Sequence, residues 1–115
     1  QNLEYLDLSY DPDKSGLETS FRGTIPTSLG NSNPALTEIY LAGNQFNGTF
    51  PQAFTKLTNL EHLDVSRNQF TLTLPPELSN MTSLKTFVAN DNLLSGPIPS
   101  ELGMLSNADL RLFKV

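Results

Sequence analysis

Apolar residues recur along this chain at a fixed spacing. The phrase Leu-x-x-apolar-x-apolar begins at Leu36, Leu60 and Leu84, so each start lies 24 residues after the previous one. Related phrases begin at Leu3 and Leu110. The last two apolar positions of each phrase are two residues apart, which places both on the same face of a strand. A period of this length is typical of a solenoid in which the strands of successive repeats stack into a parallel sheet.

The second half of each repeat contains signals for a turn and a corner. An Asn follows the strand phrase at Asn44, Asn68 and Asn92. We expect these short amide side chains to form a ladder that bonds to backbone groups where the chain bends. Because Pro fixes φ and lacks an N–H, a recurring apolar-Pro pair predicts an extended corner, after which only one short helical turn fits before the next strand. These pairs are Ile25-Pro26, Phe50-Pro51, Leu74-Pro75 and Ile98-Pro99.

The spacing organises residues 1–115 as a single domain of stacked repeats. The repeats cover about 3–35, 36–59, 60–83 and 84–109, and a partial repeat covers 110–115. The first repeat is longer than the others because residues 10–19 form an insertion. Leu72 stands where the other repeats have Gly23, Gly48 and Gly96. If that position requires φ above zero, the backbone at Leu72 must differ, because only Gly adopts such angles freely.

The corner segment carries a family resemblance. Leu94-Ser95-Gly96-Pro97-Ile98-Pro99-Ser100-Glu101-Leu102-Gly103 follows the pattern L-x-G-x-I-P-x-x-L-G. Together with the strand phrase and the Asn, it resembles the plant-type leucine-rich repeats of receptor-like proteins, receptor kinases and polygalacturonase-inhibiting proteins. The resemblance covers essentially the whole chain. It implies an α/β fold: a curved right-handed solenoid with a parallel β-sheet on the concave face, short 3₁₀ or helical segments on the convex face, and a second short sheet near the Gly-x-Ile-Pro segment.

Composition narrows the class of partner. The chain has 115 residues, a formal net charge of −5 and no cysteine. An acidic balance argues against nucleic acid, because phosphate contacts select basic surfaces. Without cysteine this stretch has no disulfide, no thiolate metal site and no Cys nucleophile. No apolar run approaches the ~18 residues of a membrane span, so membrane attachment would require a segment outside this chain.

The outward positions of the concave sheet form the candidate binding surface. They mix aromatic, acidic and hydrogen-bonding groups on a rigid scaffold, which suits recognition of a protein, peptide or saccharide. Tyr5, Tyr40 and Val88 are the expected anchors. Carboxylates on the same face would select a basic or hydroxyl-rich ligand. The predicted ligand-binding residues are Tyr5, Asp7, Glu38, Tyr40, His62, Asp64, Arg67, Thr86, Val88 and Asn90, and Ser9, Ala42 and Ser66 are expected to be exposed beside them.

Two groups of residues are candidates for chemistry. His62 and Asp64 lie two apart on one face, but no nucleophile, pocket or motif accompanies them, so we expect an exposed polar pair and no enzyme. Asp11-Pro12-Asp13-Lys14-Ser15-Gly16 resembles the first half of a calcium loop. The twelfth position would be Arg22 where calcium needs a bidentate Glu, so we expect a polar turn and neither a metal nor another cofactor.

The chain contains two sequons for N-glycosylation, Asn47-Gly48-Thr49 and Asn80-Met81-Thr82, and in a secreted protein we expect at least one of them to carry a glycan. We expect Asn47 and Asn80 to reach solvent, and we predict an extracellular or cell-surface location. The chain begins and ends within repeat phrases without a recognisable cap, so we expect a fragment of a longer ectodomain.

The predicted function is that of a non-catalytic recognition module within a receptor-like ectodomain, whose ligand is a protein, a peptide or a saccharide. A kinase domain elsewhere on the parent chain is compatible with this hypothesis, but nothing in the sequence indicates one. The alternative is a soluble inhibitor of a secreted enzyme, similar to polygalacturonase-inhibiting proteins. An ice-binding solenoid would need a flat, regular Thr or Asn array, and the exposed ladder is irregular.

Overall fold

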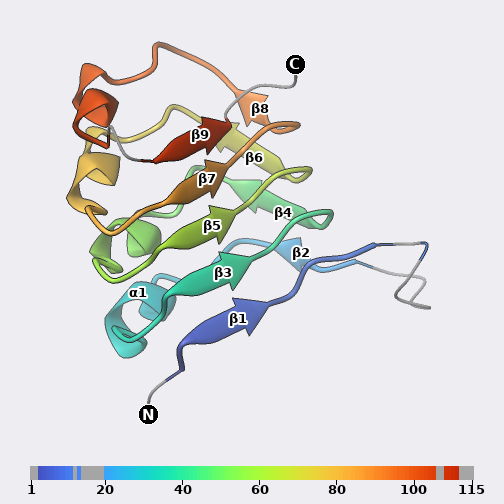
Figure 1. The fold of residues 1–115 in the computed structure, drawn as a ribbon. Helices are drawn as coiled ribbons and strands as arrows, with labels where there is room; N and C mark the ends of the chain where they lie inside the picture. The colour runs from blue at the N-terminus through green and yellow to red at the C-terminus, as the bar shows by residue number, and fades with distance from the viewer. Residues whose placement is uncertain (1–2, 12, 14–19, 106–107, 112–115) are drawn as a thin grey trace.

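Each repeat contributes one strand to a parallel sheet of five strands, ordered β1-β3-β5-β7-β9. The computed structural model describes residues 3–11, 13, 20–105 and 108–111, and Figure 1 shows the strands stacked along the solenoid. This larger sheet is the expected concave sheet. Its strands are β1 (Tyr5–Asp7), β3 (Glu38–Tyr40), β5 (His62–Asp64), β7 (Thr86–Val88) and β9 (Asp109–Arg111).

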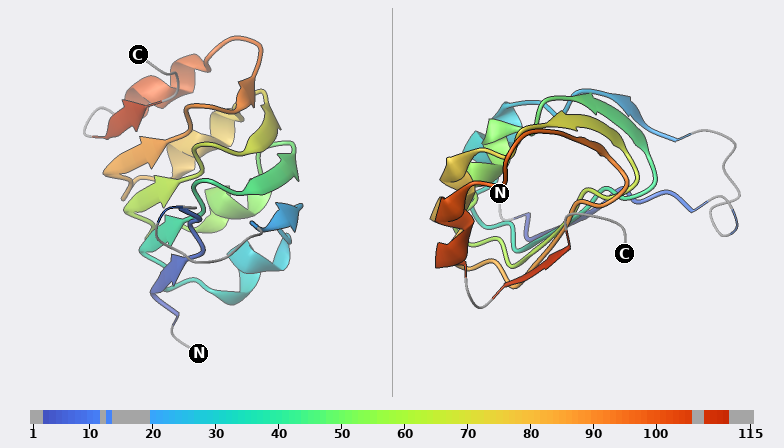
Figure 2. Two further views of the ribbon diagram at one scale, coloured as in Figure 1. Left: turned by 90° about the vertical axis from the view of Figure 1, so that its right-hand side faces the viewer. Right: turned by 90° about the horizontal axis from the view of Figure 1, so that it is seen from above.

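Two further sides close the solenoid. A smaller parallel sheet has the order β2-β4-β6-β8, and short helices form the convex side. Figure 2 shows the two sheets and the helical segments as separate sides around the interior. The smaller sheet comprises β2 (Arg22–Gly23), β4 (Gln45–Gly48), β6 (Gln69–Leu72) and β8 (Leu93–Leu94). The helices are α1 (Ser28–Ser32) and the 3₁₀ segments η1 (Gln52–Lys56), η2 (Pro76–Asn80) and η3 (Ser100–Met104). The predicted α/β solenoid is confirmed.

The core is a stack of equivalent apolar residues from successive repeats. In β3, β5 and β7 the central residue is buried and its two neighbours are half-buried. The register therefore places Ile39 beside Leu63, and Leu63 beside Phe87. All three side chains are fully buried. Complete burial of an aliphatic or aromatic side chain contributes about 1.5–3 kcal/mol, which is why the apolar spacing dominates the fold.

A column of phenylalanines runs along the smaller sheet. Phe21 and Phe46 stack with ring centroids 6.4 Å apart, and Phe46 and Phe70 stack at 6.5 Å. Phe46, between the other two rings, and Phe70 are buried, whereas Phe21 stands at the end of the column and is exposed.

The Asn residues after the strands join neighbouring repeats. Asn68 donates from Nδ2 to the carbonyls of Leu41, at 2.9 Å, and Val65, at 3.1 Å. Its Oδ1 accepts from the backbone N–H of Phe46 at 3.1 Å. Asn44 and Asn92 make the equivalent bonds to their own repeat and to the preceding one. Each amide thus satisfies backbone groups of two repeats that would otherwise lie buried and unpaired.

The residue before each of these Asn residues adopts a left-handed backbone. The φ angles are +79° at Gly43, +53° at Arg67 and +59° at Asp91. The glycines of the corner also have positive φ, at Gly23, Gly48 and Gly96. In the third repeat, strand β6 continues through Leu72, which pairs with Leu94.

Candidate functional site

The register of the larger sheet arranges the predicted binding residues in two rows. Because successive strands pair at equivalent repeat positions, side chains two residues apart on one strand belong to two parallel rows on the same face. The first row is Tyr5, Glu38, His62, Thr86 and Asp109, and the second row is Asp7, Tyr40, Asp64, Val88 and Arg111. Eight of the ten predicted binding residues lie in these rows; Arg67 and Asn90 follow β5 and β7.

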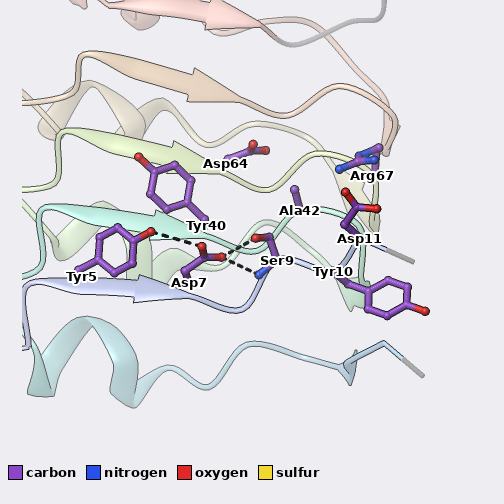
Figure 3. A pocket seen from close by; sticks show the side chains of 9 residues that line it. All are labelled: Tyr5, Asp7, Ser9, Tyr10, Asp11, Tyr40, Ala42, Asp64 and Arg67. Carbon is purple, nitrogen blue, oxygen red and sulfur yellow. Dashed lines mark hydrogen bonds between the residues drawn. The ribbon is translucent and has the colours of Figure 1, made fainter. Parts of the chain in front are cut away.

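A cavity of about 330 Å³ opens on this face at its N-terminal half. Figure 3 shows Tyr5 and Tyr40 at one end of the cavity and Tyr10, Asp11 and Arg67 at the other. The lining residues are Tyr5, Asp7, Ser9, Tyr10, Asp11, Tyr40, Ala42, Asp64 and Arg67. Five predicted residues therefore meet here, while Glu38, His62, Thr86, Val88 and Asn90 do not line the cavity.

Two tyrosines define one wall of the cavity. The rings of Tyr5 and Tyr40 lie 5.7 Å apart and are tilted by 51°. Tyr40 donates its hydroxyl to Glu38 Oε2 at 2.8 Å, and Tyr5 donates to Asp7 Oδ2 at 3.3 Å. Partial burial, followed by the hydrogen bond to Glu38, raises the pKa of Tyr40 to about 12. The Tyr40 hydroxyl is therefore a neutral donor at physiological pH.

Two carboxylates are fixed at the ends of their strands by the same Asp-x-Ser arrangement. Asp7 Oδ1 accepts from the backbone N–H of Ser9 at 2.9 Å and also from the Ser9 hydroxyl. Asp64 Oδ1 accepts from Ser66 N at 3.0 Å and from Ser66 Oγ at 2.6 Å. The bonds from the Ser9 side chain and backbone lower the pKa of Asp7, because they stabilise its charged form. Asp64 Oδ2 has no hydrogen bond among the described residues, so it is available to a ligand.

The cavity carries an excess of negative charge. Among the described residues, three carboxylates, from Asp7, Asp11 and Asp64, border it together with one guanidinium, from Arg67. Glu38 lies beside the cavity through its bond to Tyr40. An arrangement of ionised carboxylates around aromatic rings favours a cationic group, which gains from both.

Tyr10 and Asp11 are lining residues that the sequence reasoning did not select, because they open the insertion at 10–19. Tyr10 donates its N–H to the carbonyl of Ala42 at 2.8 Å, as Gly43 does to Ser66 and Arg67 does to Asn90, so the chain after β1 continues the regular pairing with the next repeat. A Cβ on Gly43 would lie 2.2 Å from the Tyr10 carbonyl oxygen. The absence of a side chain at Gly43 therefore permits the close approach of Tyr10. The insertion itself, placed directly after a concave strand, was the only available signal.

The expectation that Ala42 and Ser66 are exposed is wrong. Each is only 5% exposed. Both lie beyond the strand end, where the backbone turns inward to the Asn ladder, and strand alternation no longer applies. The preceding repeat pairs with both residues, through Tyr10 N–H to the Ala42 carbonyl and Gly43 N–H to the Ser66 carbonyl, and the Ser66 hydroxyl folds back onto Asp64.

His62 and Asp64 do not form an acid–base pair in the described structure. His62 Nδ1 lies 2.8 Å from Thr86 Oγ1 on the neighbouring strand, while Asp64 is engaged by Ser66. The shared face brings the two residues near each other, but each bonds elsewhere, so the geometry for proton transfer between them is lacking.

The calcium-like pattern at 11–16 and most of the insertion at 10–19 fall outside the described residues. Of that pattern, Asp11 and Asp13 are described, and Asp11 Oδ1 accepts from the Asp13 N–H at 2.9 Å. Within 3–11, 13, 20–105 and 108–111, no three His, Cys, Asp or Glu side chains are placed to hold a metal ion. In the same ranges, no helix is long and apolar enough to cross a membrane.

The two sequon asparagines are exposed in the structure. Asn47 lies on β4 of the smaller sheet, and Asn80 is the last residue of η2 on the convex side. Neither borders the cavity on the concave face.

Solved structures of plant receptors resemble this chain. The ectodomain of the membrane receptor kinase GASSHO1/SCHENGEN3 from Arabidopsis thaliana, in complex with CASPARIAN STRIP INTEGRITY FACTOR 2, is 34% identical with a TM-score of 0.84 over 97% of this chain. The Arabidopsis receptor kinase HAESA, in complex with the peptide hormone IDA and the co-receptor SERK1, is 34% identical with a TM-score of 0.81 over 95% of this chain. This chain spans only 12% and 17% of those two proteins.

Two further comparisons bear on the family. A plant ice-binding protein is 22% identical, with a TM-score of 0.75 over 97% of this chain and 34% of its own, which shows the shared fold alone. No curated protein matches this chain in sequence. Residues 34–94, more than half of the chain, match the family model of the leucine rich repeat. With its repeats, its two sheets and its plant receptor neighbours, the chain belongs to the plant-type leucine-rich repeat family.

Proposed function

We propose that the concave face of this chain is a non-catalytic binding surface for a peptide or a protein segment, and that a basic side chain of the ligand enters the cavity. The observation that carries the proposal is the cavity itself, in which two tyrosine rings and three carboxylates converge. A guanidinium or ammonium group would stack on the tyrosines and pair with Asp64, whose Oδ2 is available.

The rigidity of the site supports this function. The carboxylates of Asp7 and Asp64 are held by the serines two residues on, and the hydroxyl of Tyr40 is held by Glu38. A ligand that meets preorganised side chains loses little free energy to ordering them, so a small surface can bind usefully. The strands beneath are fixed by the buried core, which keeps the rows in register.

The related structures support a receptor-type setting. The two plant receptor kinases described above are recorded with a peptide hormone or a named factor bound to their ectodomains. By analogy, this chain would act outside the cell as part of a receptor-like ectodomain. No specific observation favours the alternative of an enzyme inhibitor.

The test is a binding screen with short peptides of equal length that differ only in one central residue: Arg, Lys, Gln or Glu. The Arg and Lys peptides should bind, and the Gln and Glu peptides should not. Tyr40→Ala and Asp64→Asn should each weaken binding about tenfold, the loss expected for one cation–π contact or one charged hydrogen bond. Gln69→Ala, at an exposed position of β6 in the smaller sheet and away from the concave face, is the control and should bind normally.

Binding should also weaken as salt rises, because the attraction of a cation to exposed carboxylates is screened. Equal binding of the Arg and Glu peptides would refute the proposed cationic subsite. Unchanged affinity in both Tyr40→Ala and Asp64→Asn would refute the assignment of binding to this cavity. Circular dichroism of each variant checks that the fold is intact.

A further inference from the structure

A second hollow lies on the smaller sheet, separate from the concave cavity. Its volume is about 330 Å³. It is bordered by the chain at the ends of strands β2 and β4 and by the start of η1. Among the described residues no charged side chain borders it. Its polar lining comes from Thr24, Thr27, Asn47, Thr49 and Gln52, and its apolar lining comes from Ile25, Phe50 and Pro51. A neutral hollow that combines hydroxyl and amide groups with apolar surface suits an uncharged ligand that carries both hydroxyl groups and an apolar group.

The hollow contains both chemical groups of a glycosylation sequon. Strand alternation in β4 turns Phe46 inward, where it is buried, and turns Asn47 outward to solvent. Among the described residues the side chain of Asn47 makes no hydrogen bond, so its Nδ2 is accessible. Thr49, the third residue of the sequon, borders the same hollow.

Gly48, between them, keeps the hollow open. It has φ of +90° and lacks a side chain, and a Cβ at this position would lie 3.3 Å from Thr24 Cγ2. A larger residue at 48 would therefore fill the space beside Asn47. In the next repeat the equivalent position is Leu72, so the sequence offers this combination of Asn, Gly and Thr once.

We propose that this hollow receives the first N-acetylglucosamine of a glycan linked to Asn47. The bond forms between Asn47 Nδ2 and the anomeric carbon of an oligosaccharide diphosphate donor. The diphosphate departs, Nδ2 loses one proton, and no group is oxidised or reduced. The inference rests on the proposed extracellular location, because the donor and its transferase belong to the secretory pathway.

The size and chemistry of the hollow fit one sugar. Its volume is at the lower end of the roughly 300–1,000 Å³ of small-molecule sites, so one ring fills it and the remaining glycan extends into solvent. Thr24, Thr27 and Gln52 supply hydrogen-bonding groups, and Ile25 supplies an apolar contact for the acetyl methyl. A linked sugar needs little intrinsic affinity, because the covalent bond gives it a high effective concentration at the hollow.

Asn80 provides the matched comparison. It is exposed at the end of η2 and does not border this hollow. A glycan on Asn80 should therefore project into solvent without stabilising the fold.

The test compares wild type, Asn47→Gln and Asn80→Gln, each secreted from a eukaryotic host and each also produced in bacteria that add no N-glycan. The bacterial set measures the effect of the substitutions alone. Mass spectrometry gives the occupancy of each site, and an endoglycosidase trims the glycans to a single sugar before thermal unfolding. The glycan should raise the melting temperature of wild type and of Asn80→Gln by about 4 °C, and the trimmed form should keep the increase. Asn47→Gln should show no increase.

Nuclear Overhauser contacts in the trimmed Asn80→Gln protein test the location directly, and they should connect the acetyl methyl to the side chain of Ile25. A double variant, Thr27→Ala with Gln52→Ala, should retain occupancy at Asn47 but lose most of the thermal increase. Free N-acetylglucosamine, added to the bacterial protein, should perturb Thr24 and Thr49 only at high millimolar concentration. The proposal is overturned if Asn47 is unoccupied in the secreted protein, or if removal of either glycan has the same effect on stability. Contacts of the sugar with the concave face would overturn it as well.

Discussion

The effect of a methyl group at Gly30 follows directly from how the convex segments pack. Gly30 lies in α1 and is buried against the backbone of η1 in the next repeat. A Cβ built on it would be 2.1 Å from the carbonyl oxygen of Ala53, 2.8 Å from its carbonyl carbon and 3.0 Å from its Cα. These are backbone atoms, which cannot rotate away as the end of a side chain would. Gly30→Ala therefore forces α1 and η1 apart.

The change that Gly30→Ala causes in the free energy of unfolding follows from two opposing effects. Overpacking of a well-packed interior costs about 1–3 kcal/mol, and backbone contact on a rigid neighbour belongs at the upper end. Replacement of Gly by Ala within a helix contributes about 1 kcal/mol in the other direction. The net loss should be about 2 kcal/mol in the free energy of unfolding, which corresponds to a fall of about 8 °C in melting temperature for a chain of this length.

Gly103 supplies the control within the same molecule. It follows Leu102 in η3 as Gly30 follows Leu29 in α1, so the two glycines occupy the same motif position. A Cβ on Gly103 would meet no heavy atom within 4 Å in the described structure. Thermal and urea unfolding, followed by circular dichroism, should show Gly103→Ala equal to or slightly more stable than wild type. The packing argument would be refuted if Gly30→Ala unfolded at the same temperature and urea concentration as wild type. It would also be refuted if Gly30→Ala and Gly103→Ala lost the same free energy of unfolding.

Three more predictions concern the Asn ladder, the contact between Gly43 and Tyr10, and the hydroxyl of Tyr40. Asn68→Ala should cost about 3 kcal/mol in urea unfolding, because it leaves buried backbone groups of two repeats without partners; a cost below about 1 kcal/mol would contradict this. Gly43→Ala should displace the backbone of Tyr10 and weaken binding of the Arg peptide, whereas unchanged affinity would show that the contact between Tyr10 and Gly43 does not shape the cavity. The pKa of Tyr40 is raised from 10.0 to about 12, so its stabilising effect is present below pH 10 and is lost as pH rises toward 12. Tyrosinate absorbance should reveal this late titration, and Glu38→Gln should lower its midpoint.

Much of the fold follows from short-range rules that the sequence displays. The strands could be placed because two apolar residues, such as Leu63 and Val65, must share one buried face. The bonds of the Asn ladder, as at Asn68, follow from a short amide at a fixed place in a bend. Equal spacing then puts the predicted binding residues in rows, because strands of successive repeats pair at equivalent positions.

The rest depends on contacts between segments that no local pattern records. Tyr10 reaches the cavity because its carbonyl lies against Gly43, which has no side chain, and the insertion that carries Tyr10 has no repeat period. Ala42 and Ser66 are buried at a position where the backbone of the preceding repeat pairs with them beyond the strand ends. Gly30 and Gly103 occupy the same motif position, but only Gly30 has the backbone of a neighbouring segment against it. In each case the neighbouring segment, and not the residue, decides the outcome.

The parallel register also relates the spacing between strands to the spacing between residues of any extended peptide that lies along the stack. Neighbouring strands are about 4.8 Å apart, whereas a peptide in the polyproline II conformation advances about 3.1 Å per residue and completes one turn in three residues. Three ligand residues therefore span nearly the same length, about 9–10 Å, as two repeats, and the side chains at positions i and i+3 face the same side. If a basic residue lies over Tyr40, the residue three positions along lies over Val88, two strands away in the same row. The concave face should thus read its ligand with a period of three, as a basic residue and an apolar residue at positions i and i+3.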